Sequence, residues 1–179
     1  AGGGFDVTIG VVDYPFQSRI SWPNGNYNVL ADTATGEAGL QVTTQSLGAN
    51  LYEVTATGSY YNLYREIEVF PTHVSVKDKY TNDWTQDLGL LVYNEVPVTP
   101  AQVDVSLLSG FDRYGRQIEV TFPDSGPTTF FTDSNTGLGI IPLDDVFVVQ
   151  AIVYVDWQGA AGVGTEEFAL APGDDHTLE

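Results

Sequence analysis

The chain has no cysteine and no methionine, and it has few basic residues. Without cysteine it forms no disulfide bond, no thiolate metal site and no cysteine nucleophile. Only 6 Lys and Arg residues stand against 24 Asp and Glu residues, which gives a formal net charge of −18. Binding to nucleic acid or to anionic lipid needs Lys and Arg, so we expect neither as a partner. A solvated acidic surface, cations or a basic partner agree with this charge.

Long apolar runs and helical periodicity are also missing. No segment approaches the length of a membrane-spanning helix, so we expect no membrane insertion. The opening residues, AGGGFDV, lack the basic and apolar regions of a signal peptide. No window of about 12 residues carries apolar positions at i, i+3, i+4 and i+7 without an interrupting Gly or Pro. The sequence therefore predicts little or no helix.

Short strand-like segments fill the chain instead, at intervals of about 10 to 15 residues. The segment Leu63–Phe70 is the clearest, because Ile67 and Val69 alternate with glutamates and place one face on a core. Turn residues among the 19 Gly and 9 Pro separate these segments. This pattern predicts an all-β fold, an antiparallel β-sandwich. The length favours a single domain that spans residues 1–179.

One segment, Val146–Trp157, is apolar at almost every position. A strand that is apolar on both faces is typical of the centre of a covered sheet. We expect this strand to anchor the core, with Phe147, Val149 and Val153 buried. The glycine-rich stretch Gly159–Gly164 is predicted to be a flexible turn. The EEFAL segment that follows it is the expected hairpin partner of the central strand.

Four parts of the chain together carry a resemblance. They are Arg65–Asn82, Pro127–Phe147, Glu167–Glu179, and the opening Phe5-Asp6-Val7 taken with Trp22–Gly25. They resemble the β-supersandwich domains, galactose-mutarotase-like in fold, of large secreted carbohydrate-active and surface proteins. Those domains share an R-x-V-x-V-x-P-x-x-I-x-V-x-D-x-x-T-N strand pair and a closing F-x-L-x-P-G-x-x-x-T-L-E-W. The chain is shorter than a full supersandwich. The resemblance implies the fold, an extracellular or cell-surface location and an association with glycans.

Aromatic rings in polar loops are the strongest functional signal. A sugar face stacks on a Trp or Tyr ring, while neighbouring Asn and Asp side chains bind its hydroxyl groups. Two loops, 22–27 and 80–87, combine these residue types. The predicted carbohydrate-binding residues are Trp84, Tyr80, Asn82, Asp83, Trp22 and Tyr27, with Trp84 as the main candidate. The alternative is that each Trp covers an end of the core.

Metal binding and catalysis have weaker support. Asp78, Asp83 and Asp87 surround one turn and are the predicted ligands of a structural Ca²⁺, which prefers oxygen ligands. The alternative for these residues is ordinary turn chemistry. Sugar epimerisation would use a His acid with a Glu base, but the 2 His residues belong to no recognisable constellation. We therefore assign no catalytic residue and expect no cofactor other than Ca²⁺.

Three classes of function remain open. The leading hypothesis is a non-catalytic β-sandwich module, a glycan-contacting or accessory lobe of a larger extracellular protein. The second is a structural or assembly subunit of a surface layer, filament or shell, whose partner is another protein or further copies of the chain. The third is a carbohydrate enzyme of the mutarotase or lyase kind.

Overall fold

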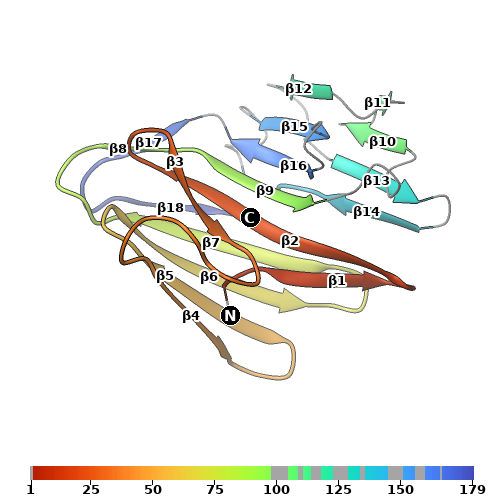
Figure 1. Cartoon of the computed structure of the whole chain (residues 1–179), viewed down its shortest axis with the longest axis horizontal. Coiled ribbons are helices and arrows are strands. Elements are labelled where there is room, and N and C mark those ends of the chain that lie inside the picture. The colour runs from red at the N-terminus through yellow and green to blue at the C-terminus, as the bar shows by residue number, and fades with distance from the viewer. Residues whose placement is uncertain are drawn as a thin grey trace. The chain divides into compact units, whose positions relative to one another are not determined.

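The computed structural model describes most of the chain. The described residues are 2–97, 105–108, 111–113, 118–122, 129–133, 136–144, 151–155, 160–165 and 167–179. They form strands β1 to β18 and no helix (Figure 1). The strand pairs are antiparallel, and the predicted all-β, sandwich-like fold class is confirmed. Within these ranges no helix has the length and apolar character needed to span a membrane.

The contacts divide the chain into two interleaved compact units. The first unit consists of Ala1–Gly4, Arg19–Leu90 and Glu167–Glu179, and the second consists of Phe5–Ser18 and Leu91–Glu166. Both chain termini therefore belong to the first unit. The expectation of a single domain over residues 1–179 stays a prediction.

A five-stranded antiparallel sheet dominates the first unit (Figure 1). Its order is β18 (Asp175–Leu178), β7 (Val74–Asn82), β6 (Tyr61–Val69), β5 (Leu51–Thr57) and β4 (Gln41–Ser46). The predicted alternation is present in the centre of this sheet. Leu63 and Ile67 are buried on one face, and Tyr64 is exposed on the other. Val69, which was also expected on the core face, is 38% exposed at the end of β6.

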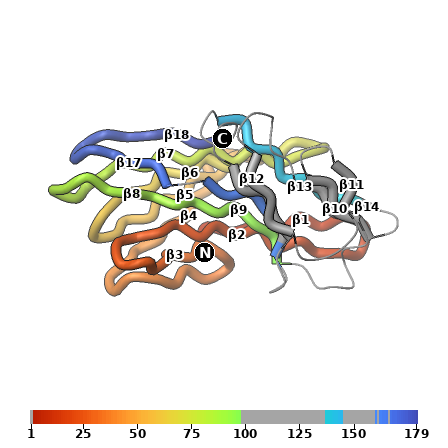
Figure 2. The backbone as a smooth tube through the Cα atoms, turned by 90° about the horizontal axis from the view of Figure 1, so that it is seen from above, coloured from red at the N-terminus to blue at the C-terminus, as the bar shows by residue number. Residues whose placement is uncertain are grey.

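Two smaller pairings complete the first unit. Strand β8 (Leu88–Leu90) pairs with β17 (Phe168–Leu170), and the two run side by side in Figure 2. Strand β3 (Asn26–Leu30) pairs with β2 (Val12–Trp22), whose last residues, from Arg19 on, belong to this unit. Leu88, Leu90 and Leu170 are buried where β8 meets β17.

The second unit contains two antiparallel sheets. One has the order β1 (Phe5–Ile9), β2, β9 (Val92–Pro97), β16 (Ala160–Thr165), β15 (Ala151–Val155) and β12 (Ile118–Phe122). The other has the order β11 (Phe111–Arg113), β10 (Val105–Leu108), β13 (Thr129–Asp133) and β14 (Thr136–Ile140). Strand β13 lies against β15 and β16, and β10 lies against β15. Tyr14, Val92 and Val163 are buried in this unit.

The predicted central strand is partly described. Its residues 151–155 form β15, which has a neighbour on each side, so this part is an inner strand as expected. Residues 146–150 lie outside the described residues, as do the side chains of Phe147, Val149 and Val153.

Two local expectations were wrong. The segment predicted as a flexible turn is largely strand β16, and β16 and β12, not EEFAL, are the partners of β15. Gly162 and Gly164 stand where an added Cβ would collide with Asn94, Glu95 or the Tyr93 ring of β9. Glycine in a strand marks such a close approach. Leu91 separates β8 from β9, and β2 is a long strand that ends at Trp22.

Candidate functional site

Three aromatic rings from separate segments of the first unit meet in one cluster. Trp22 stacks on Tyr60 with ring centroids 5.9 Å apart and an interplanar angle of 16°. Tyr60 meets Trp84 edge to face, with centroids 5.4 Å apart and an angle of 82°. All three residues are half-buried. We call Trp22, Tyr60 and Trp84 the aromatic cluster.

Trp22 is held by a tight hairpin between β2 and β3. Asn24 and Gly25 have φ values of 74° and 73°, the left-handed conformations that a type I′ turn requires and that Asn-Gly favours. The side-chain amide of Asn26 donates to the carbonyl oxygen of Pro23 at 3.4 Å. Within the described residues, Trp22 Nε1 is buried and has no hydrogen-bond partner.

Tyr60 lies in a turn whose backbone is hydrogen-bonded to the buried carboxylate of Glu37. Glu37 is 8% exposed, and its Oε2 accepts a hydrogen bond from the backbone N–H of Ser59 at 3.0 Å. The N–H of Gly58 donates to the carbonyl oxygen of Tyr61 at 3.1 Å. An added Cβ at Gly58 would collide with Glu37 Oε1, so a larger residue there would displace the carboxylate from this position.

Asn28 completes the support beneath this turn. Its Nδ2 donates to Glu37 Oε1 at 3.1 Å and to the Tyr61 hydroxyl oxygen at 2.8 Å. Its Oδ1 accepts from the backbone N–H of Glu37 at 2.9 Å. Burial raises the pKa of Tyr61 above its ordinary value, and the nearby charge of Glu37 adds to the effect, although the hydrogen bond from Asn28 opposes it. Tyr61 therefore stays neutral. Asn28, Glu37 and Tyr61 form a hydrogen-bonded polar network beneath the turn.

The loop that carries Trp84 is organised by the side chain of Asn82. Asn82 Oδ1 accepts from the backbone N–H of Trp84 at 2.8 Å, and Nδ2 donates to the carbonyl oxygens of Gln86 and Leu170, both at 2.8 Å. Such an amide satisfies the backbone of a turn that no strand pairs. The backbone N–H of Asp83 donates to the carbonyl oxygen of Tyr60 at 3.0 Å, which links the two aromatic turns directly.

The structure therefore separates the predicted carbohydrate-binding residues into two groups. Trp84 and Trp22 join the aromatic cluster, and Asp83, which precedes Trp84 in the chain, is exposed. Tyr80 and Asn82 are 0% and 1% exposed and bond to the protein itself, so neither offers a surface to a sugar. Their predicted roles are corrected, because the burial of β7 turns both side chains toward the core.

Tyr27 lies on β3, in the same hairpin as Trp22, and is half-buried. The guanidinium of Arg19 stands 5.5 Å from the centre of its ring, within the range of a cation–π interaction. The contact with carbohydrate that the sequence predicts for Tyr27 stays a prediction.

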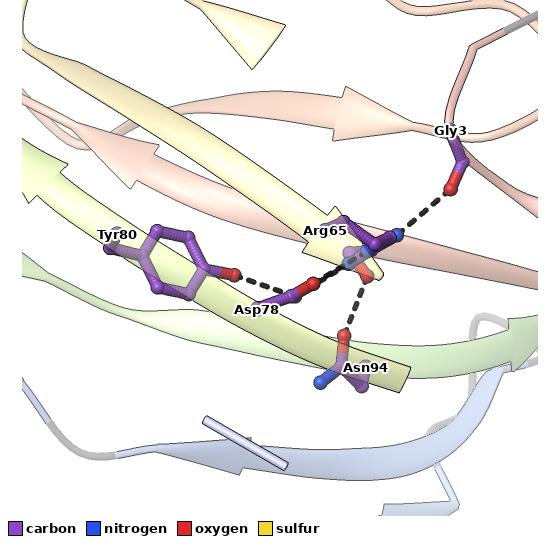
Figure 3. Close-up of polar contacts among 6 residues, drawn as sticks. Gly3, Arg65, Asp78, Tyr80 and Asn94 are labelled. Carbon is purple, nitrogen blue, oxygen red and sulfur yellow. Dashed lines mark hydrogen bonds and ion pairs between the residues drawn. The ribbon is translucent and has the colours of Figure 1, made fainter. Parts of the chain in front are cut away.

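Tyr80 belongs instead to a buried polar cluster around Arg65 (Figure 3). Arg65 Nε and Nη2 donate to the two carboxylate oxygens of Asp78, each at 2.7 Å, and Nη1 donates to the carbonyl oxygen of Gly3 at 2.9 Å. The Tyr80 hydroxyl donates to Asp78 Oδ2 at 3.0 Å. Arg65 and Asp78 are 0% and 2% exposed and lie directly opposite each other on β6 and β7.

Burial by itself shifts the pKa values of Arg65 and Tyr80, the two titratable partners of Asp78, in opposite directions. It opposes the charged form of Arg65, but the charge and hydrogen bonds of Asp78 outweigh it and raise the pKa of Arg65. For Tyr80, burial raises the pKa well above its ordinary value, and the charge of Asp78 reinforces this shift. The ion pair is thus formed while Tyr80 remains a neutral donor.

The predicted Ca²⁺ ligands do not come together. Asp78 is buried and its two carboxylate oxygens accept bonds from Arg65 and Tyr80, whereas Asp83 and Asp87 are exposed on the loop. Within the described ranges no group of three or more His, Cys, Asp or Glu residues could hold a metal ion. Asp78, Asp83 and Asp87 therefore do not form the predicted Ca²⁺ site.

Sequence reasoning missed the residue that joins the two loops. Tyr60 has the same signal as Trp84, a large ring inside a polar turn, but it lies outside the two loops, 22–27 and 80–87, that the sequence singled out. No local pattern marks Glu37 or Asn28 as supports, because both act across the fold on the distant turn of Tyr60.

Comparison with known proteins adds no relative. Neither a protein-family model, nor a curated protein, nor a solved structure matches the chain.

Proposed function

We propose that this protein is a non-catalytic β-sandwich module that contacts carbohydrate at the aromatic cluster of Trp22, Tyr60 and Trp84. One observation carries the proposal. Two loops that the sequence marks independently by an aromatic ring among polar residues are brought together by Tyr60. The resemblance to supersandwich domains supports the same ligand class and an accessory role within a larger extracellular protein.

The chemistry of the cluster suits a sugar ring. Half-buried aromatic rings offer both faces and edges for the apolar C–H groups of a pyranose. Asp83, which precedes Trp84 in the chain, is exposed, and its carboxylate can accept hydrogen bonds from hydroxyl groups. The supports below the rings, Asn82 and Glu37, hold the turns in place before any ligand arrives. A pre-organised site loses less entropy on binding.

A glycan array with the intact chain, followed by calorimetric titration of the best ligand, tests this function. Trp84→Ala should weaken binding by about 1–3 kcal/mol, by analogy with the loss of an aromatic ring that stacks on a planar base. It should leave the melting temperature nearly unchanged, because the backbone N–H that Asn82 holds is kept.

Tyr64→Ala is the matched control. Tyr64 is an exposed ring of the same unit, 40% exposed on the outer face of β6, and its loss should leave glycan affinity unchanged. The proposal is wrong if no glycan binds the intact chain. It is also wrong if Trp84→Ala lowers the melting temperature strongly without changing affinity, since Trp84 would then be an end cap of the core.

A further inference from the structure

The two edges of the five-stranded sheet are protected very differently. Strand β18, at one edge, begins with Asp175, whose carboxylate forms an ion pair with Lys79 at 2.7 Å, and it is followed by Glu179. Strand β4, at the other edge, has the sequence QVTTQS, with no charged residue and no proline. Exposed edge strands normally carry charges or proline, which prevent pairing with another chain. Strand β4 has neither device.

Strand β4 also lies in the most neutral part of a very acidic chain. No charged residue occurs from Ala38 to Tyr52, the longest such run in a chain of net charge −18. Residues Thr43 to Asn50 are all exposed. Among the described strands, β4 pairs with β5 alone. An uncharged, accessible strand edge is therefore available.

An exposed apolar corner continues this edge. Leu47 is 48% exposed, Tyr52 36%, Val69 38% and Phe70 38%. The backbone joins these segments, because the N–H of Val69 donates to the carbonyl oxygen of Asn50 at 2.8 Å. Leu47 directly follows β4, so the open edge ends beside exposed apolar area.

The hydrogen-bond pattern shows which backbone groups point outward. The N–H of Leu47 donates to the carbonyl oxygen of Leu51 at 2.8 Å, so the backbone groups of Leu47 face β5. In an antiparallel pair this direction alternates along the strand. The N–H and C=O groups of Val42, Thr44 and Ser46 therefore face away from the sheet.

We propose that β4 is a self-association edge, at which a second copy of this chain adds its own β4 in antiparallel orientation. With Thr44 on the two-fold axis, Thr44 pairs with its own copy and Val42 pairs with Ser46 of the other copy. This register satisfies every outward-facing backbone group of the strand. The two sheets then join into one continuous sheet.

The distribution of charge favours a second copy of this chain as the partner of β4. Two chains of net charge −18 repel each other over most of their surfaces. A two-fold contact sets the same surface against itself, so it needs a strip without charge. Strand β4 is such a strip, and the β18 edge, with Asp175 and Glu179, is not. Added salt should strengthen the association, because it screens the remaining repulsion.

Cross-linking tests the register directly, because the chain has no cysteine. In Thr44→Cys the two thiols face each other across the axis, with Cα atoms about 5.5 Å apart. A short bismaleimide should then give covalent dimers in high yield. Thr177→Cys is the matched control, an introduced thiol on the other edge strand of the same sheet. Equal yields from the two variants would overturn the proposal.

Sedimentation equilibrium provides the second measurement, on the unmodified chain and on Thr44→Lys and Thr177→Lys. The unmodified chain and Thr177→Lys should dimerise with rising concentration. Thr44→Lys should weaken dimerisation at least about tenfold, because it places like charges opposite each other on the axis. A wild-type chain that stays monomeric in high salt up to its solubility limit would contradict the proposal. So would a Thr44→Lys variant that dimerises as tightly as Thr177→Lys.

Discussion

Arg65 is a fully buried charged residue of the first unit. A fully buried guanidinium is tolerated only when its charge is balanced and its donors are used. Asp78 provides the charge, and the carbonyl oxygen of Gly3 takes a further donor (Figure 3). The pair thereby connects β6 and β7 with the first residues of the chain. Desolvation opposes the attraction of the two ions, so the pair contributes less net stability than the loss of one partner would cost.

Asp78→Asn should destabilise the protein by about 3–5 kcal/mol, since it leaves the buried Arg65 charge uncompensated. The change keeps the size of the side chain, so the loss reports on charge and not on a cavity. Urea unfolding followed by tryptophan fluorescence measures it.

The exposed ion pair of the same sheet is the comparison for this variant. Lys79 and Asp175 lie 2.7 Å apart with side chains 47% and 48% exposed. Asp175→Asn should change stability by less than about 1 kcal/mol, because water screens exposed pairs. Similar losses in the two variants would show that Arg65 is not effectively desolvated.

At the scale of elements, strand β16 shows how packing can override local preference. Its sequence AAGVGT is poor in β-formers, yet it pairs with both β9 and β15. The Tyr93 ring of β9 lies over Gly164, within 2.6 Å of where a Cβ would be. Aromatic residues on a neighbouring strand can cover a strand glycine in this way. The glycines thus allow a close approach to β9 and are not hinges.

Gly162→Ala should destabilise the protein by about 1–3 kcal/mol, the usual cost of forcing extra volume into a packed site. The added Cβ would collide with the carbonyl oxygen of Asn94 and stand 2.8 Å from Glu95 Cα, and backbone atoms cannot move aside cheaply. Chemical denaturation measures the loss.

Gly48→Ala is the control, because a Cβ at Gly48 has nothing within 4 Å. That variant should stay within about 0.5 kcal/mol of the unmodified chain, as exposed substitutions usually do. A Gly162→Ala variant as stable as Gly48→Ala would show that β16 does not pack closely on β9.

At the scale of the whole molecule, the chain passes between the two compact units repeatedly. The first unit combines the two ends of the chain with residues 19–90. Its last segment supplies β17 and β18, which complete the pairing of β8 and β7. Leu170 and Leu178 are 6% and 2% exposed, so this segment contributes to the core. Such long-range pairing makes the stability of the unit depend on its final residues.

Removal of residues 167–179 should therefore cost at least about 3 kcal/mol, because two buried leucines and two strand pairings are lost. Thermal unfolding followed by circular dichroism should show a much lower midpoint or no cooperative transition. Removal of Glu179 alone, an exposed residue, should have little effect. An unchanged midpoint after the longer truncation would mean that β17 and β18 are only loosely attached.

Local pattern was sufficient for the fold class and for much of the strand content. Alternation in β6 and β7, together with the density of turn residues, predicted antiparallel all-β structure, because a period of two matches a strand with one covered face and not a helix. Pattern also selected Trp22 and Trp84, since a large ring among turn residues is a local property of the sequence.

Tertiary structure decided which polar residues face outward and which segments meet. Tyr80 and Asn82 belong to a polar-looking stretch, but the pairing of β7 with β6 and β18 directs them into the core. Tyr60 joins Trp22 to Trp84 only through long-range packing. The physical reason is that an alternating pattern fixes the two faces of a strand but not its neighbours. Register and the position of an edge, such as that of β4, follow from contacts between distant segments.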